Sequence, residues 1–329
     1  MAMTIKDIAK EAGVSPAAVS RYFNGGSLSE EKKSAISEVV ERHHFVPNQT
    51  ASSMRTGKTG HIGVIVPKIH SDSLSHLMHG ISTGLKKSDR TMIVGCADGN
   101  TELEVRYIRA MESGGMEGII LMGTVMTPYL SNTIDKCGIP LVVTGQSFPG
   151  IPCVYYDDFN AMRELAGLML KKRKHIAYIG AIEEDAAVGK TRRLGALKAM
   201  EEAGLDPKKM LCTVSGFDIE NGYEAMNKLL KKRSKIDGVL CATDSMALGA
   251  MLALREAGMS IPEDVSVAGI GNSISGRVTI PQLTTVRLFF EQCGETAVRL
   301  IEEMIADGDR SMAISQIRLG YEIIERGSI

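Results

Sequence analysis

The sequence lacks the features that mark exported, membrane-spanning or metal-binding proteins. It has no apolar run of about 18 residues and no apolar leader, so we expect a cytoplasmic protein that is neither exported nor membrane-spanning. None of its six cysteines forms a CxxC pair and its seven histidines show no ligand spacing, so zinc and redox motifs are not indicated. We therefore expect no metal and no cofactor, and most cysteines buried as reduced thiols.

An excess of positive charge is also missing. The net charge is −1, from 38 Lys and Arg against 39 Asp and Glu. A small DNA-binding segment on a large neutral body would leave the total near zero, so this balance is only weak evidence against nucleic acid. Residues 1–60 carry eight basic against six acidic residues, and Arg55 and Lys58 stand in a stretch without acid between Glu41 and Asp72. Basic groups placed there could neutralise phosphates.

Residues 4–24, TIKDIAKEAGVSPAAVSRYFN, have the pattern of two short helices joined by a tight turn. Thr4 suits the N-cap of the first helix, Gly13 suits its end, and Ser15 with Pro16 suits the start of the second. With Ala18 and Val19 turned toward the first helix, the side chains left for other contacts are Ala17, Ser20, Arg21 and Asn24.

This pattern predicts a helix-turn-helix, whose usual target is the DNA major groove. A helical hairpin that only packs shows the same spacing, so the pattern alone leaves both interpretations open. Ser29 then suits the N-cap of a third helix that ends near Phe45. The polar stretch 47–60 is typical of a flexible linker, but residues 51–55 could form a short helix that needs a partner or ligand.

From His61 onward, continuous apolar runs alternate with helical periodicity in two series, at about 61–144 and 161–270. This alternation predicts two doubly wound α/β lobes, each with a parallel sheet covered on both faces. Ligands of such folds bind at the carboxyl ends of the strands, and here also between the lobes.

Short motifs of catalysis and nucleotide binding fail when tested. A phosphate loop ending at 189–191 needs glycine where Glu184 stands, and the GIGNSISG stretch lacks the spacing of a dinucleotide fingerprint or a nucleophile elbow. Asp157 and Asp158 form a possible pair of catalytic carboxylates, but such a pair more often ends a strand and caps a helix. No catalytic constellation remains, so we expect no enzyme.

The order of these segments resembles the LacI/GalR family of transcriptional regulators over essentially the full length. The resemblance is carried by TIKDIAKEAGVSPAAVSRYFN, PNQTASSMRTGKTGHIGVIVP, VLCATDSMALGAMLALREAG and IPEDVSVAGIGN followed by PQLTTVR. It implies an all-α headpiece over 1–46, a hinge over 47–60 and two periplasmic-binding-protein-like α/β lobes over 61–329. Lobe 1 would span about 61–156 and 288–314, and lobe 2 about 157–287 and 315–329.

The resemblance also implies where DNA is contacted. Pro16, Ala17 and Arg21 match the family's recognition positions, and Arg21 suits a guanine edge or a phosphate. In the hinge helix, Met54 stands where the family usually places a leucine wedge in the minor groove. The implied contacts are Thr4, Ser15, Pro16, Ala17, Ser20, Arg21, Asn24, Asn48, Ala51, Met54 and Arg55.

An effector site between the lobes is implied in the same way. Gly145 and Gly271 stand where the family often has aspartates, and Lys190 where it commonly has an arginine. Segments such as VYYDDFNAM look most like disaccharide-operon repressors, which implies a sugar or sugar phosphate, and Lys190 would suit an anionic one. The implied effector residues are Pro67, Asp72, Gly145, Gln146, Lys190, Phe217, Asp244, Gly271, Asn272 and Phe290.

The hypothesis at this point is a cytoplasmic repressor of a carbohydrate operon, acting as a homodimer on a pseudo-palindromic double-stranded operator. Effector binding would change lobe closure, melt the hinge helices and alter operator affinity. The alternatives are a sugar-binding protein without a DNA role, a sugar-processing enzyme, and a global regulator that uses a protein co-effector. The headpiece argues against the first, and the missing acid/base pair against the second.

Overall fold

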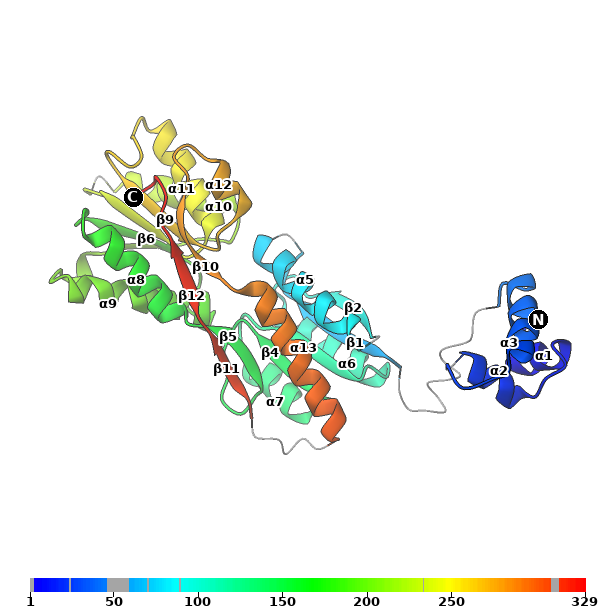
Figure 1. Ribbon diagram of the computed structural model, residues 1–329. Helices are drawn as coiled ribbons and strands as arrows, with labels where there is room; N and C mark the ends of the chain where they lie inside the picture. The colour runs from blue at the N-terminus through cyan, green and yellow to red at the C-terminus, as the bar shows by residue number, and fades with distance from the viewer. Residues whose placement is uncertain are drawn as a thin grey trace. The chain divides into compact units, whose positions relative to one another are not determined.

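The computed structural model describes residues 3–23, 25–45, 59–69, 71–88, 90–232, 234–308 and 314–329. It divides into two compact units, Met1–Thr59 and Gly60–Ile329. Figure 1 shows the helices and strands of both units along the chain. The hinge expected at 47–60 falls almost wholly outside the described residues.

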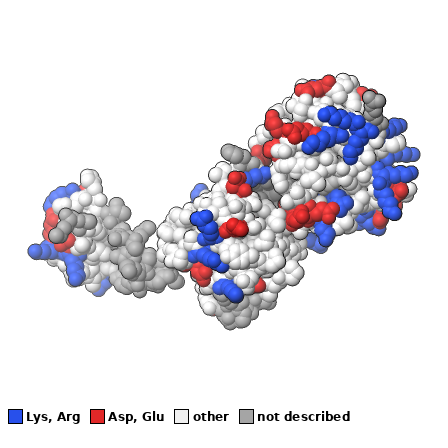
Figure 2. All heavy atoms as spheres, turned by 180° about the vertical axis from the view of Figure 1, so that it is seen from behind, with Lys and Arg blue, Asp and Glu red and all other residues white. Residues whose placement is uncertain are grey.

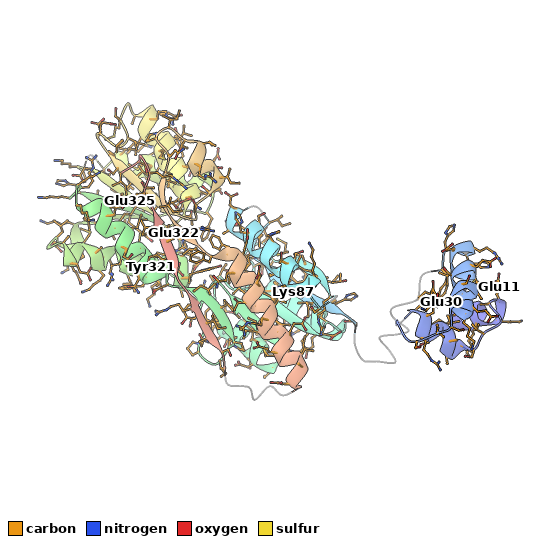
Figure 3. The ribbon with its side chains drawn as sticks, in the orientation of Figure 1. Glu11, Glu30, Lys87, Tyr321, Glu322 and Glu325 are labelled. Carbon is orange, nitrogen blue, oxygen red and sulfur yellow. The ribbon has the colours of Figure 1, made fainter. Side chains whose placement is uncertain are left out.

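The first unit is a helical headpiece, and its described helices are α1 (Ile5–Glu11), α2 (Pro16–Phe23) and α3 (Glu30–Arg42). A capping box fixes the start of α1, because the Thr4 hydroxyl accepts from the Asp7 amide while the Asp7 carboxylate accepts from the Thr4 amide. Glu11, labelled in Figure 3, joins α1 to α3 by pairing with Arg42 at 3.0 Å. The buried apolar core comes from all three helices: Ile8, Ala9, Val19, Ile36 and Val39.

The second unit consists of two α/β lobes. Lobe 1 has a parallel sheet in the order β11-β5-β4-β3-β1-β2. Its described strands are β1 (His61–Val66), β2 (Thr91–Cys96), β3 (Gly118–Met122), β4 (Leu141–Thr144), β5 (Cys153–Tyr156) and β11 (Gln316–Leu319). Its described helices are α5 (Asp72–Lys86), α6 (Thr101–Ser113), α7 (Pro128–Lys136) and α13 (Phe290–Asp307).

Helices cover both faces of this sheet, as expected for continuous apolar strands. Ile62 and Val64 of β1 belong to the cluster that includes α5 and α13, whereas Ile65 belongs to the cluster of α6 and α7. Alternate residues of one strand therefore serve two cores, which is why the strand is apolar throughout.

Lobe 2 repeats the design with a sheet in the order β12-β10-β9-β8-β6-β7. Its described strands are β6 (Ile176–Gly180), β7 (Leu211–Val214), β8 (Gly238–Cys241), β9 (Ser266–Ile270), β10 (Thr284–Leu288) and β12 (Tyr321–Ile324). Its described helices are α8 (Asp158–Leu170), α9 (Arg192–Glu202), α10 (Ile219–Leu230), α11 (Asp244–Glu256) and α12 (Ile274–Val278), with shorter turns at Ala186–Thr191 and Pro207–Lys209. β12 runs antiparallel to β10, and the other strand pairs are parallel.

The doubly wound α/β lobes predicted from the sequence are confirmed, but their boundary near the C-terminus needs correction. Residues 315–329 were expected in lobe 2, whereas β11 pairs with β5 in lobe 1, with Gln316 opposite Cys153. The chain changes sheets at Gly320, and Tyr321 then begins β12 opposite Leu288 in lobe 2. The C-terminal run looks like one strand in the sequence, but it forms two, because the chain passes from the edge of one sheet to the edge of the other. Figure 1 shows both strands along one path.

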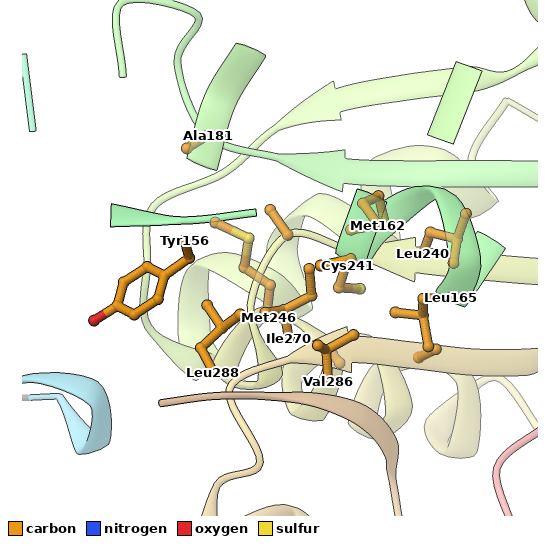
Figure 4. Packing of buried hydrophobic residues seen from close by; sticks show 14 of the residues in the cluster. Tyr156, Met162, Leu165, Ala181, Leu240, Cys241, Met246, Ile270, Val286 and Leu288 are labelled. Carbon is orange, nitrogen blue, oxygen red and sulfur yellow. The ribbon is translucent and has the colours of Figure 1, made fainter. Parts of the chain in front are cut away.

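The core of lobe 2 is rich in methionine and small residues. Met162 of α8 and Met246 of α11 are fully buried in one cluster with Cys241 and Val286. Figure 4 shows Tyr156 at the edge of this group, with its hydroxyl directed away from it. The unbranched methionine side chains fill the irregular space between sheet and helices.

The surface charges of the second unit are mixed in sign. Figure 2 shows Lys and Arg interspersed with Asp and Glu over one face of the two lobes. Such a face carries no extended field of one sign, in keeping with the net charge of −1.

Glu104 on α6 is an exception to the rule that buried acids are paired. It is 1% exposed, and neither carboxylate oxygen has a hydrogen-bond partner among the described residues. Burial raises the pKa of Glu104 to about 7. The carboxyl is therefore easier to protonate in the folded protein than in the unfolded chain, whose glutamates keep the ordinary pKa.

This burial predicts a pH-dependent effect of Glu104→Gln. The folded state binds the extra proton, so the contribution of Glu104 to stability is greatest below about pH 4.5 and is lost as the pH rises through about 7. The variant should raise the Tm by several degrees at pH 8 and by much less at pH 5, since it removes the buried charge. Glu102→Gln, an exposed position on the same helix, is the matched control. Equal Tm differences at both pH values would contradict this account.

Candidate nucleic-acid interface and effector cavity

The exposed face of α2 carries the side chains that the sequence assigned to DNA. Ser15 accepts a hydrogen bond from the Ala18 amide at 3.2 Å and so begins the helix. Ala18 and Val19 are buried against the other helices, whereas Pro16, Ala17 and Arg21 are exposed. The predicted inward position of Ala18 and Val19 and outward position of Ala17 and Arg21 are confirmed.

Arg21 is the charged group of that face. Among the described residues its guanidinium has no hydrogen-bond or ion-pair partner, so its donors remain available to a ligand. Thr4 differs, because its hydroxyl is engaged with Asp7 in the capping box. Ser20 is half-buried. The remaining predicted DNA contacts lie outside the described residues: Asn24, Asn48, Ala51, Met54 and Arg55.

A cavity of about 370 Å³ lies where the carboxyl ends of strands from both lobes face each other. That volume suits a small molecule of a few fused or linked rings at most. Of the ten predicted effector residues, these eight line it: Pro67, Asp72, Gly145, Gln146, Phe217, Asp244, Gly271 and Phe290. Lys190 and Asn272 do not.

Gln146 and Asp185 connect the lobes across this cavity. Gln146 follows β4 in lobe 1, and its Nε2 donates to Asp185 Oδ1 of lobe 2 at 2.9 Å and to the Thr124 carbonyl oxygen. Gly145, with φ +86°, makes the turn that directs Gln146 inward. Any other residue at this position would be strained, because its side chain disfavours a positive φ. Both side chains are 3% exposed, and Gln146 Oε1 has no donor among the described residues.

Asp185 also begins a π-helical turn that determines which cation reaches the cavity. Its carboxylate accepts from the Val188 amide at 2.9 Å. Through this turn, Ala186–Thr191, Lys190 is exposed and Arg192 is 6% exposed and lines the cavity. The expectation that Lys190 lines the cavity is wrong, because the wider π turn changes which residues face inward.

Arg192 is held by a buried ion pair. Its Nε donates to Asp158 Oδ1 at 2.7 Å and its Nη1 to the Ala242 carbonyl oxygen at 2.5 Å. Asp157 accepts from the Asn160 amide and caps α8. The Asp157–Asp158 pair thus ends a strand and caps a helix, as the sequence favoured, and Asp158 in addition neutralises Arg192.

Asp244 organises the loop after β9. Its carboxylate accepts from Thr285 Oγ1 at 2.6 Å and from the Ser273 amide at 2.7 Å, and it is 3% exposed. Burial raises the pKa of Asp244 despite these bonds. Asn272 in that loop is turned to Arg326, whose Nη2 donates to Asn272 Oδ1 at 2.6 Å. Asn272 therefore holds the loop and not the cavity, contrary to expectation.

Aromatic side chains form apolar walls. Tyr156 and Phe290 make an edge-to-face pair with ring centroids 5.3 Å apart. Phe217 of lobe 2 lies beneath the ammonium of Lys68 of lobe 1, with Nζ 4.4 Å from the ring centroid. Flat apolar walls beside hydrogen-bonding groups suit a ring that bears hydroxyl groups.

Among the lining residues that the sequence reasoning missed are three charged ones in the interior of the wall: Lys68, Asp185 and Arg192. Each had a weak local signal. Lys68 directly follows a strand with Pro67, and Asp185 precedes a helical segment as a cap would. Arg192 lies beside Arg193 in a stretch without acids from Ala186 to Met200, and only the turn geometry shows which cation is buried.

A helix-turn-helix joined in one chain to a two-lobed, periplasmic-binding-protein-like body defines a DNA-binding transcriptional regulator. Residues 4–48 match the bacterial regulatory proteins of the lacI family, and residues 167–329 match the periplasmic binding protein-like domain. The chain belongs to the LacI family and is a DNA-binding transcriptional repressor.

Relatives and solved structures agree with this assignment. The transcriptional regulator RegA of Clostridium saccharobutylicum is 30% identical and covers 100% of this chain and 99% of its own. The sucrose operon repressor of Staphylococcus xylosus is 27% identical over 92% of this chain and 93% of its own, and the repressor PurR of Erwinia tasmaniensis is 30% identical over 99% and 96%. The Lac repressor dimer bound to operator and an anti-inducer has the same fold, with a TM-score of 0.89 at 20% identity over 100% and 99%.

Two further observations concern the described residues only. None of their helices is long and apolar enough to cross a bilayer. No group of histidine, cysteine, aspartate and glutamate side chains among them has the arrangement of a metal site.

Asp157 and Asp158 provide a matched test of the cavity wall. Asp158→Ala leaves Arg192 buried without its carboxylate, which should cost about 3–5 kcal/mol of the free energy of unfolding. Asp157→Ala removes a helix cap and should cost about 1 kcal/mol. Urea unfolding of both variants measures the difference. If Asp157→Ala is the more damaging substitution, Arg192 does not depend on Asp158 in the way described.

Proposed function

We propose that this protein represses a carbohydrate-utilisation operon, and that a sugar or sugar phosphate between its lobes controls operator affinity. The observation that carries the proposal is one chain with an outward-facing recognition helix and a cavity lined from two lobes. A protein that only bound sugar would not need Arg21 exposed on a helix-turn-helix, and a DNA-binding protein without an effector would not need the cavity.

The headpiece supports DNA binding through its charge and its rigidity. Arg21 is the exposed cation of α2, and its backbone is fixed by the cap at Ser15 and by the buried contacts of Val19. Pro16 and Ala17 offer only apolar contacts, for example to thymine methyl groups. Arg21 therefore supplies most of the hydrogen-bonding readout from this helix, and the hinge around Met54 would supply the rest by deforming DNA.

A polyhydroxylated effector is supported by the mixture of groups in the cavity. Polar side chains such as Lys68 and Ser245 line the cavity, and the aromatic rings of Phe217, Phe290 and Tyr156 provide apolar faces. Sugars present hydroxyl donors at their rims and apolar C–H faces, so both requirements are met by one molecule. The likeness to the sucrose operon repressor points to the same class.

A homodimer is supported by an exposed apolar patch on lobe 2. Ile274 and Val278 of α12 and Ile280 beyond it are 66%, 76% and 88% exposed. Three such exposed apolar side chains within seven residues are consistent with a surface that a second copy of the chain covers. A two-fold dimer would present two headpieces to the half-sites of a pseudo-palindromic operator.

The two sites are coupled in this proposal through lobe closure. The effector contacts both lobes, so binding changes their relative position, and the chain at the start of β1 transmits the change to the hinge and headpiece. Closure that separates the hinges of a dimer would weaken their packing in the minor groove, and the hinge helices would melt.

Arg21→Ala tests the DNA-binding part. With duplexes selected by the wild-type protein from a random pool, the variant should bind about 5- to 150-fold more weakly while its binding to unrelated duplex changes little. Gel-shift titrations at fixed salt measure both affinities. Lys33→Ala, which removes an exposed cation of α3, is the control and should keep the specificity. An Arg21 variant that retains full specificity would refute the role assigned to this helix.

A further inference from the structure

Lys68 occupies an unusual position at the rim of the cavity. It follows β1 in lobe 1 and is half-buried, and its ammonium rests against Phe217 from lobe 2 at 4.4 Å from the ring centroid. The side chain therefore crosses from one lobe to the other and lines the cavity on the way.

The hydrogen-bonding capacity of this ammonium is unused. Among the described residues Lys68 has no hydrogen-bond acceptor and no ion-pair partner, although an ammonium has three donors. Asp218 is the acid that acts on it, but both Asp218 oxygens accept bonds from Asn221, at 2.6–2.7 Å. Burial lowers the pKa of Lys68 and Asp218 opposes this only in part.

The other charged groups of the cavity wall are held in hydrogen bonds or an ion pair, or lie at its rim. Arg192 is paired with Asp158, Asp244 accepts from Thr285 and Ser273, and Asp185 accepts from Gln146 and Val188. Asp72 and Asp98 are exposed, so water screens them. Among the described lining residues, Lys68 is thus the cation without a paired carboxylate.

Two helix N-termini also lie at the cavity. α5 and α11 begin there from opposite lobes, with Ser71 and Thr243 as their caps. The N-terminal ends of helices favour negative charge, and their first turns already carry Asp72 and Asp244. The unpaired ammonium of Lys68 is therefore the feature of the wall that points to an anion.

We propose that Lys68 binds a negatively charged group, a phosphate or a carboxylate, on a polyhydroxylated effector. The inference rests on the proposed function and narrows it to an anionic effector. Exchange of a cation–π contact for a charge-assisted hydrogen bond transfers Lys68 from Phe217 to the ligand. Without effector, Lys68 of lobe 1 contacts lobe 2 through the Phe217 ring. With effector bound, Lys68 contacts the ligand between the lobes instead.

The test uses the full-length protein and matched sugars. Isothermal titration is performed with glucose, glucose 6-phosphate and glucuronate, and with trehalose and trehalose 6-phosphate. At least one phosphate or carboxylate should bind about 10- to 100-fold more tightly than its neutral parent, and the phosphate and carboxylate arms show which anion is read. Lys68→Met should remove this preference and Lys68→Arg should keep it.

Control variants separate a specific site from a general charge effect. Lys190→Met removes an exposed lysine outside the cavity and should leave anion binding unchanged. Lys68→Met with undiminished preference for anions overturns the proposal, and so does the absence of binding by every anionic sugar. If only a neutral sugar binds and alters operator affinity, the anion inference fails while the proposed regulator stands. If operator affinity responds to no sugar that binds, the proposed function fails instead.

Discussion

The hydrogen bond from Gln146 to Asp185 sets the geometry on which the cavity depends. This hydrogen bond joins lobe 1 to lobe 2 at a place away from the chain crossings, and both of its partners are buried. Asp185 also holds the π-helical turn through the Val188 amide, and that turn brings Arg192 to the wall. Loss of the Asp185 carboxylate would therefore remove this contact between the lobes and the cap of the turn together.

The chemistry of the cavity follows from how its charges are balanced. Buried acids there serve to hold protein groups: Asp158 holds Arg192, and Asp244 holds the loop that contains Ser273. A buried charge is costly unless it is paired, so these contacts use up the carboxylates that a first inspection would assign to the ligand. The groups that remain for an effector include the ammonium of Lys68, lining hydroxyl groups such as that of Ser245, and the aromatic walls.

Local patterns in the sequence were sufficient for most of the fold. The capping box at Thr4, the burial of Val19 and the doubly wound lobes follow from caps and periodicity, which act over a few residues. The division of the C-terminal run at Gly320 was missed, because it depends on β5 and β10, strands far away in the sequence. Strand pairing of that kind leaves no mark in the run itself.

The candidate site was predicted less completely for the same reason. Pro67 and Gln146 were placed at the cavity by the family resemblance, and they line it because the parallel strands that they follow all end at that edge. Lys190 and Asn272 were misplaced, since a π turn and a loop tied to Arg326 decide which neighbours face inward. Lys68 was overlooked because its partner Phe217 belongs to the other lobe.

The central claim is that effector and operator sites are coupled, and thermodynamic reciprocity tests it most directly. The measurement is the operator Kd with and without a sugar that binds, together with the Kd of that sugar with and without operator. The account predicts that both ratios are equal and differ from one by at least about fivefold. Ratios of one in both directions would show two independent sites and contradict the account.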